Sequence, residues 1–258
     1  MQTTIIQQTN RLTRYFRISR VAMHTLVGVA TVSLVFPLVR SSHKINIMQW
    51  WHRRLLAALN IQITTHGNVP QQMAGTLVVA NHISWLDIHA LNSVVPLRFI
   101  AKSEIKHWPI FGYLAKSADV LFIDRENRKD AVRVAHTTAS SLEAGDNLCL
   151  FPEGTTTDGN SVLPFKSSLI QAVLHANATL QPVAIRYPLA NGDANILMAY
   201  AGDTSLKTSL SQILQQKTPK VELHFLSPIF TADLSDEDKN RRTLTAFIEQ
   251  NIRQKLGL

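Results

Sequence analysis

The sequence predicts an α/β fold in which a mainly parallel central sheet is flanked by helices. From about residue 61 onward, short runs rich in β-branched residues alternate with stretches of helical periodicity. This alternation is typical of strands joined by helical crossovers. A chain of 258 residues, 45% of them hydrophobic, is long enough for one such domain and a modest appendage. We therefore expect a basic arm and a two-helix element over residues 1–60, followed by one α/β domain over residues 61–258.

The N-terminal third of the chain is both basic and apolar. Its first acidic residue is Asp87, and residues 1–86 contain eight Lys and Arg, whereas residues 87–258 carry 18 basic and 18 acidic residues. A basic segment beside apolar sequence favours contact with anionic lipid, while one beside a soluble domain would favour nucleic acid. Because the neighbouring residues are apolar, we expect membrane lipids as partners and no nucleic acid.

Residues 21–39 predict the first of two N-terminal helices. These nineteen residues carry no charge and are just long enough to span a bilayer. Pro37 would kink or end the helix, and the absence of a small-residue cleavage site argues against a removed signal peptide. Four basic residues on each side give no preferred orientation. We favour a hairpin that dips into one leaflet, with both ends cytoplasmic, over a true span.

Residues 44–59 predict the second helix. A basic edge formed by Arg53 and Arg54 lies beside apolar residues at three- and four-residue spacing, namely Met48, Trp51, Leu55 and Leu59. This composition is typical of a helix at a membrane interface. The alternative is a buried core helix, which would not explain eight unopposed cations. We expect the protein at the cytoplasmic face of the inner (plasma) membrane, held there through residues 21–60.

Predicted strands and helices alternate through the rest of the chain. Strands are expected at residues 61–65, 76–80, 98–101, 120–123, 148–151, 182–186, 196–200 and 221–225. Helices are expected at residues 85–91, 108–116, 128–143, 166–176, 205–216 and 236–255.

Polar residues directly follow the predicted strand at residues 76–80. Asn81 and His82 would stand at its carboxyl end, where open α/β sheets bind ligands. If the next helix begins only at Ser84, Asp87 lies in its first turn and reaches the imidazole of His82. Such a carboxylate fixes the tautomer of the ring and stabilises its protonated form, which suits a general base. Because Ser84-x-x-Asp87 also has the form of a capping box, capping alone is the alternative role of Asp87.

Neither a metal site nor a covalent enzyme intermediate is expected. A metal at His82 and His89 would lack a ligand-rich partner motif, and the chain has a single cysteine, Cys149. The same count excludes an intramolecular disulfide. Cys149 falls in the apolar run of a predicted strand, which is a poor place for a reactive thiolate. No Gly-x-Ser-x-Gly elbow supplies a nucleophilic serine.

Three further segments place polar residues just beyond predicted strands. They are Lys102-Ser103-Glu104, Asp124-Arg125 and Glu153-Gly154-Thr155. The structural alternatives are a solvated edge, a surface ion pair and a turn, respectively. In a parallel sheet, these three segments and His82 would converge on one crevice.

Together these segments resemble the four motif blocks of the glycerolipid acyltransferases. Asn-His-x-x-x-x-Asp from residue 81, Lys-x-Glu from 102, Phe-Ile-Asp-Arg from 122, Phe-Pro-Glu-Gly-Thr from 151 and Pro182-Val183 occur in the same order and spacing. The resemblance is to the PlsC-like lysophospholipid acyltransferase family, of the bacterial 1-acylglycerol-3-phosphate O-acyltransferase type, and covers residues 75–190. An N-terminal membrane-associated two-helix element also occurs in that family.

The resemblance implies an enzyme of phospholipid biosynthesis that moves a fatty acyl group from acyl-CoA or acyl-ACP to the free hydroxyl of a lysolipid. The first acceptor that it implies is 1-acyl-sn-glycerol-3-phosphate, which gives phosphatidic acid. It implies His82 as the base, oriented by Asp87, with no cofactor beyond the acyl thioester, which is a co-substrate. The substrate contacts that it implies come from Arg125, Glu153, Gly154 and Thr155, with Lys102 and Lys166 as phosphate neighbours.

One departure from the family pattern concerns the acceptor. The family commonly has Arg two residues after the Gly of the Glu-Gly-Thr block, where this chain has Thr156. A hydroxyl does not offer the bidentate, permanently charged fork that suits a phosphate. Lyso-ornithine lipid or another lysolipid without a phosphate headgroup is therefore the alternative acceptor. More remote alternatives are a catalytically silent lipid-binding protein and a lipid hydrolase in which the His–Asp pair activates water.

Overall fold

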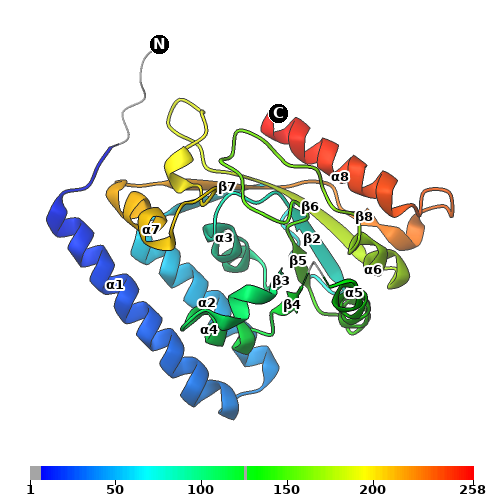
Figure 1. Ribbon diagram of the computed structural model, residues 1–258, viewed down its shortest axis with the longest axis horizontal. Helices are drawn as coiled ribbons and strands as arrows, with labels where there is room; N and C mark the ends of the chain where they lie inside the picture. Colours follow the sequence, from blue (N-terminus) through cyan, green and yellow to red (C-terminus); the bar gives the residue numbers. More distant parts are fainter. Residues whose placement is uncertain (1–6, 125–126) are drawn as a thin grey trace.

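The computed structural model describes residues 7–124 and 127–258. Its N-terminal part is helical: α1 (Arg11–Ala30) continues through a π-helical turn, η1 (Thr31–Val35), and a 3₁₀ turn, η2 (Phe36–Leu38). The chain then reverses into α2 (Ser41–Leu59), which packs beside α1 (Figure 1). The predicted two-helix element is therefore present, although its first helix starts ten residues earlier than the apolar run.

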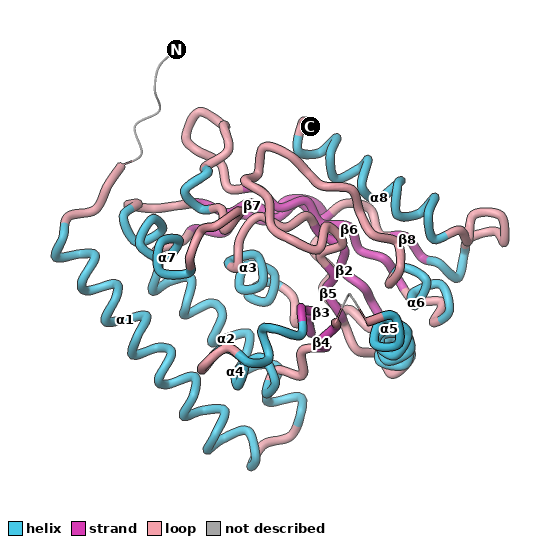
Figure 2. Tube along the Cα trace, in the orientation of Figure 1, coloured by secondary structure: helices cyan, strands magenta, loops and turns pink. Residues whose placement is uncertain are grey.

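Eight strands form one mixed sheet in the order β1-β7-β6-β2-β5-β3-β4, with β8 beside β6. Every pairing is parallel except those of β6 with β7 and β8. The predicted mainly parallel sheet is thus confirmed. Figure 2 shows its strands gathered between the helices. The strands are β1 (Gln62–Gly67), β2 (Thr76–Ala80), β3 (Arg98–Lys102), β4 (Leu121–Ile123), β5 (Leu148–Leu150), β6 (Thr179–Arg186), β7 (Lys220–Phe225) and β8 (Ile229–Phe230).

Helices cover both faces of the sheet and create two apolar cores. One core joins the sheet to α2, α3 and α7, and the other joins it to α5, α6 and α8. All five residues of β2 are buried because alternate side chains enter opposite cores, which explains its uninterrupted apolar sequence. The helices after α2 are α3 (Leu86–Val94), α4 (Phe111–Ser117), α5 (Arg128–Glu143), α6 (Ile170–His175), α7 (Leu206–Gln215) and α8 (Arg241–Leu256).

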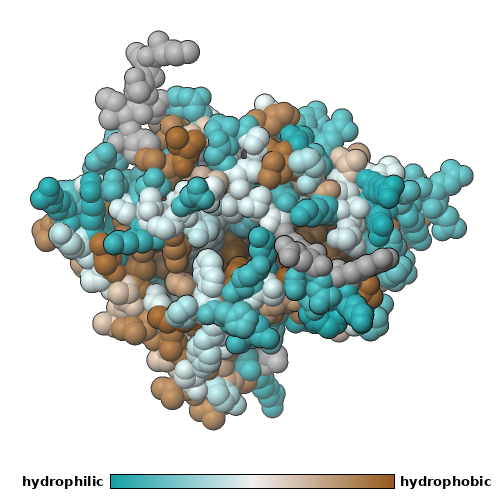
Figure 3. Space-filling model, viewed as in Figure 1, coloured by the Kyte–Doolittle hydropathy of each residue, from teal (hydrophilic) through white to brown (hydrophobic). Residues whose placement is uncertain are grey.

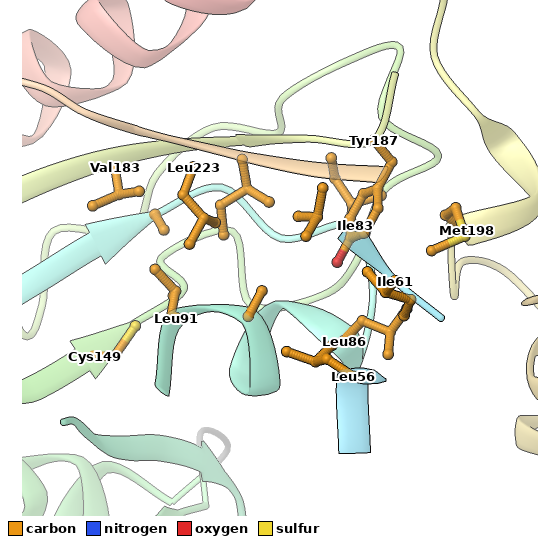
Figure 4. Packing of buried hydrophobic residues seen from close by; sticks show 14 of the residues in the cluster. Leu56, Ile61, Ile83, Leu86, Leu91, Cys149, Val183, Tyr187, Met198 and Leu223 are labelled. Carbon is orange, nitrogen blue, oxygen red and sulfur yellow. The ribbon is translucent and has the colours of Figure 1, made fainter. Parts of the chain in front are cut away.

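The first core contains the only cysteine of the chain. Cys149 lies on β5 among buried aliphatic side chains, close to Leu91 of α3 (Figure 4). Its thiol is fully buried, and burial raises its pKa well above the ordinary value. The thiol is therefore unsuited to nucleophilic attack.

Parts of the secondary-structure prediction are wrong. The helix expected from Asp236 begins only at Arg241, and two further differences have a local cause. Residues 196–200 were expected as a strand, but Ile196–Met198 form a 3₁₀ turn, η4. Met198 N donates to Asn195 O and Ala199 N to Ile196 O, so these two amides close a local turn and do not pair with a neighbouring strand. The helix expected from Lys166 begins only at Ile170, since Lys166 N donates instead to Pro152 O at 3.0 Å.

The N-terminal arginines belong to α1 itself and do not precede it. Arg17 is buried, and its guanidinium donates to the backbone carbonyls of Gln216 and Lys217, each at 2.7 Å. The start of the chain is also bound there, since Thr9 N donates to Gln215 O at 2.8 Å. Arg17 therefore attaches α1 to the segment between α7 and β7, and the expectation of eight cations free for lipid is wrong at this residue.

The apolar surface of α1 contrasts with the inner face of α2. Arg11–Leu38 form one helical stretch of 28 residues that is long and apolar enough to cross a membrane, with 11% of its most apolar window buried. In α2, Leu55 and Leu59 are buried in the first core, packed with α3. The stripe predicted to lie on lipid thus faces the protein core over the second half of α2.

Candidate active site

The site is built on the turn that follows β2. Asn81 fixes this turn, because its amide group donates to Ile185 O at 2.9 Å and accepts from Ile185 N at 2.7 Å. The asparagine side chain thus continues the pairing of β2 with β6 for one more residue. Since β2, β3, β5 and β6 run parallel, their carboxyl ends lie at one edge of the sheet, and His82 projects at that edge.

His82 and Asp87 meet as the sequence predicts. The Nδ1 atom of His82 lies 2.8 Å from Oδ2 of Asp87. The same oxygen accepts hydrogen bonds from Ile83 N at 2.7 Å and Ser84 N at 2.9 Å, so Asp87 also holds the turn that leads into α3. Asp87 therefore orients the ring of His82 and holds this turn at the same time, so the two roles do not exclude each other.

The ring of His82 is held firmly but remains accessible. It stacks on Phe151 with ring centroids 3.9 Å apart and an interplanar angle of 7°. The side chain of His82 is 17% exposed, whereas that of Asp87 is fully buried. Because Nδ1 donates to the carboxylate, Nε2 is the nitrogen left with a lone pair. The geometry therefore provides a surface-accessible imidazole nitrogen of fixed tautomer.

The sequence reasoning did not identify two side chains that shape this pair. Tyr187 donates its hydroxyl to Oδ1 of Asp87 at 2.6 Å, and burial beside Asp87 raises the pKa of Tyr187 well above its ordinary value. Tyr187 follows β6, one hundred residues after Asp87, so no local spacing connects them. Phe151 lies inside a quoted motif, but a motif gives no sign that its ring supports His82.

Glu153 braces the turn at His82. One carboxylate oxygen accepts from His82 N at 2.6 Å, and the other accepts from Leu163 N at 2.7 Å. Glu153 is 4% exposed, and burial raises its pKa, an effect that the two backbone hydrogen bonds oppose. In this structure both oxygens of Glu153 serve the protein's own backbone, so the contact with an acceptor expected from the sequence stays a prediction.

The residues after Glu153 close over the same turn. Gly154 has φ of +80°, a left-handed conformation that favours glycine. Thr157 N then donates to His82 O at 2.8 Å. The hydroxyl of Thr156 donates to the backbone carbonyl of Tyr200, while Thr155 is exposed to solvent. Among these three threonines, Thr155 is the one placed to meet a ligand.

The predicted basic contacts are spread along the site edge. Lys102 ends β3 and is exposed at the edge where His82 projects. Lys166 is also exposed, and its backbone lies against Pro152. In the described parts of the chain, no hydrogen bond joins either lysine to His82 or Asp87. Arg125, which was predicted to contact the acceptor, lies outside the described residues.

His89 is paired with His52 and not with His82, so it does not form a metal site with His82. Its Nδ1 lies 2.8 Å from Nδ1 of His52, which links α3 to α2. Burial lowers the pKa of His89 to about 3, which keeps the ring neutral near pH 7.

A separate group of possible metal ligands lies on β1 and β7. It consists of His66, Glu222 and His224, whose ligand atoms lie within 4.8 Å of one another. Its two imidazoles stack at 8°, so their lone pairs do not converge on one ion.

A cavity of about 130 Å³ lies near the site without including the histidine. Its walls include Ile83, Arg186 and Tyr187, but His82 is not among the described residues that line it. The chemistry therefore belongs to the open edge of the sheet. There, a neutral imidazole backed by a buried carboxylate can accept a proton from an alcohol or from water.

Comparison with known proteins identifies one family. Residues 60–186 match the family described as Acyltransferase. The chain is 38% identical over 201 residues to the 1-acyl-sn-glycerol-3-phosphate acyltransferase of Neisseria meningitidis, covering 78% of this chain and 77% of that protein. It is 36% identical over 200 residues to the lyso-ornithine lipid O-acyltransferase of Pseudomonas aeruginosa, covering 78% and 76%, respectively.

A solved structure shares the fold. The crystal structure of the 1-acyl-sn-glycerophosphate acyltransferase from Thermotoga maritima superposes with a TM-score of 0.69 and covers 95% of each chain. Sequence identity to that protein is 21%. The likeness therefore extends over the α/β architecture of nearly the whole chain.

Proposed function

The chain belongs to the acyltransferase family, and from that premise we propose that His82 is the general base that activates the hydroxyl of a lysolipid. The observation that carries this proposal is the 2.8 Å contact between His82 Nδ1 and the buried Asp87. This contact leaves Nε2 as the proton acceptor at an accessible edge of the sheet. Asp87 stabilises the imidazolium that forms, and Tyr187 and Glu153 hold the pair in position.

The reaction needs one proton transfer in each direction. The lysolipid oxygen attacks the thioester carbonyl carbon while its proton passes to Nε2 of His82. The tetrahedral intermediate then collapses, the carbon–sulfur bond breaks, and the departing thiolate takes the proton from the imidazolium. No acyl-enzyme is required, and the buried thiol of Cys149 on β5 offers no nucleophile.

The first candidate acceptor is 1-acyl-sn-glycerol-3-phosphate, which would place the enzyme in phospholipid biosynthesis. The curated relative from Neisseria meningitidis carries that activity in its name. Lys102 and Lys166 are exposed cations at or near the edge that bears His82. Either lysine would attract a phosphate headgroup as a point charge.

A specific observation favours a second candidate, a lyso-ornithine lipid. The position where the family commonly has Arg is Thr156, whose hydroxyl donates to Tyr200 O. That hydroxyl is therefore committed to the protein, and the charged fork for a phosphate is missing at this position. The Pseudomonas aeruginosa relative is named for lyso-ornithine lipid and is nearly as similar to this chain.

The donor and the membrane face are part of the same proposal. Acyl-CoA and acyl-ACP both present an acyl thioester on an acidic carrier, which a chain with a formal net charge of +8 would attract. Both carriers are cytoplasmic, so we place the site at the cytoplasmic face of the inner membrane. The apolar surface of α1 supports association with that membrane.

Acyl transfer by the purified enzyme tests the proposal directly. Radiolabelled acyl-CoA and acyl-ACP are each offered with lysophosphatidate and with lyso-ornithine lipid, and the diacyl products and free fatty acid are separated. We expect a diacyl product from one acceptor in clear preference to the other. Free fatty acid as the main product would instead show a hydrolase. The Thr156→Arg variant sharpens the result, since it should shift preference toward lysophosphatidate.

A further inference from the structure

The segment between β3 and β4 exposes large apolar side chains that the described residues leave partly uncovered. It consists of η3 (Ser103–His107), a tight turn and α4. Its exposed apolar residues are Trp108 at 41%, Ile110 at 50%, Phe111 at 45% and Tyr113 at 44%. Single exposed apolar residues are ordinary, but four within six positions form a patch that requires an explanation.

The backbone holds Ile110 outward at an energetic cost. Its φ is +62° and its ψ is −58°, and Phe111 N donates to Pro109 O at 2.6 Å. This geometry is the rare, strained form of the γ-turn, and a β-branched residue is unusual in it. Gly112 permits the turn to pack closely, because a Cβ there would lie 2.5 Å from the Lys106 carbonyl oxygen. Strain retained at an exposed apolar residue indicates a function outside the protein's own packing.

The patch is continuous with the apolar surface of the N-terminal helices. The hydroxyl of Tyr113 lies 3.0 Å from that of Ser33 in η1, so the two segments touch. Beside this contact, Leu34 is 70% exposed and Leu38 is 85% exposed. Figure 3 shows hydrophobic residues gathered over the C-terminal part of α1 and the turn into α2. The two segments therefore present one surface, although they are about eighty residues apart in sequence.

Cations surround the patch. Lys102, Lys106 and Lys116 are exposed, while Glu104 is the single acidic residue between Lys102 and Lys116. Apolar and aromatic side chains flanked by lysines suit the interface of an anionic bilayer, where the rings enter the headgroup region and the ammonium groups remain with the phosphates. A face that pairs with a second copy of this chain would instead need acidic partners for these lysines.

We propose that residues 103–117 are a second membrane-contacting element, seated in an anionic bilayer beside the end of α1. The proposal rests on the proposed function in one respect, namely that the bilayer supplies the lysolipid. The element follows β3, whose carboxyl end lies at the edge that bears His82. Seating it in the headgroup region therefore sets the catalytic edge close to the lipid surface.

Site-specific fluorescence tests the contact without reference to catalysis. Because Cys149, the only cysteine, is fully buried, a cysteine introduced by Ile110→Cys accepts an environment-sensitive probe selectively. Phe247→Cys is the matched control, since Phe247 is 52% exposed on α8, which covers the other face of the sheet. With vesicles of phosphatidylglycerol and phosphatidylethanolamine, we expect a blue shift and quenching by brominated lipid at position 110 but not at position 247.

Three results would overturn the proposal. The first is a probe at position 110 that stays in water while the protein is bound to vesicles. The second is an equal shift at both positions, and the third is a shift that depends on protein concentration without vesicles, which would show self-association.

An activity comparison separates this proposal from the proposed function. Asn tolerates positive φ, so Ile110→Asn removes the apolar tip while relaxing the backbone. We expect wild-type turnover of a short-chain, monomeric lysolipid and roughly tenfold weaker partitioning onto anionic vesicles. Unchanged partitioning would contradict the membrane contact, whereas absence of acyl transfer by the wild-type enzyme would contradict only the function.

Discussion

The turn at His82 and the outer surface of α1 use their side chains in opposite ways. In the turn, both oxygens of Asp87 and both oxygens of Glu153 accept hydrogen bonds from the protein. On α1 and the adjoining η1, Leu12, Met23, Leu26 and Leu34 remain largely exposed. The comparison teaches that the two regions follow different rules. At the site, hydrogen bonds within the protein hold the polar side chains in place, whereas on the N-terminal helix apolar side chains are left exposed, where lipid can cover them.

Removal of the imidazole is the largest expected effect and tests the first half of this comparison. We expect His82→Ala to lower the rate of acyl transfer roughly a thousandfold, because the proposed proton acceptor is removed. Binding to vesicles should be unchanged. His136→Ala, at an exposed position on α5, is the matched control for loss of a histidine. Turnover near the wild-type value in His82→Ala would exclude the proposed base.

Replacement of Glu153 distinguishes a brace from an acceptor contact. Glu153→Ala removes a buried carboxylate and the hydrogen bonds that it accepts from the amides of His82 and Leu163, so we expect a loss of about 2 to 4 kcal/mol in the free energy of unfolding. The turnover number should fall roughly a hundredfold, since the histidine is no longer positioned. Chemical denaturation and steady-state kinetics measure these effects. A variant with normal stability and a raised KM for lysolipid alone would show that Glu153 binds the acceptor.

A charge on η1, which continues the outer surface of α1, tests the other half of the comparison. Leu34→Asp alters a residue that is 70% exposed, so the free energy of unfolding should change by less than about 0.5 kcal/mol. Partitioning onto anionic vesicles should weaken roughly tenfold or more, because a carboxylate resists entry into lipid. Val132→Asp, at a residue that is 66% exposed on α5, should leave vesicle binding unchanged. Equal losses in both variants would show only a general charge effect.

The pair His52 and His89 links α2 to α3 and gives the smallest effect near neutral pH. Burial depresses the pKa of His89 from 6.5 to about 3. The unfolded chain therefore takes up this proton first, and the associated stability is full above pH 6.5 and is lost as the pH falls toward 3. We expect His89→Gln to flatten the fall of the unfolding free energy over this range. An unchanged slope in acid denaturation would contradict the shift.

The features predictable from sequence are those fixed by local pattern. The strand Thr76–Ala80 and the reach of Asp87 back to His82 follow from a buried apolar run and a five-residue separation. The roles of Tyr187 and Glu153 do not, because each depends on a contact with a segment at least seventy residues away. Tertiary packing alone sets those distances.

The same reason explains the errors in the helical regions. The spacing of apolar residues in α2 correctly predicted that one face of this helix is apolar. It carried no information on whether lipid or protein would cover that face. The start of α1 was placed too late because residues 11–20 carry four arginines, which interrupt the uncharged apolar run; Asn10 caps the helix by accepting from Thr13 N. A search for an uncharged apolar stretch therefore finds only the later part of this helix.

The set of donors around Asp87 has a consequence for repeated turnover. A carboxylate that accepts from an imidazole, two amides and a phenol cannot rotate without breaking the backbone turn that leads into α3. Under the proposed mechanism, the ring proton on Nδ1 therefore stays in place when product leaves, and each new alcohol meets the same lone pair on Nε2. Little reorganisation of the surroundings is needed between catalytic cycles, because the dipoles that stabilise the imidazolium are already aligned before it forms.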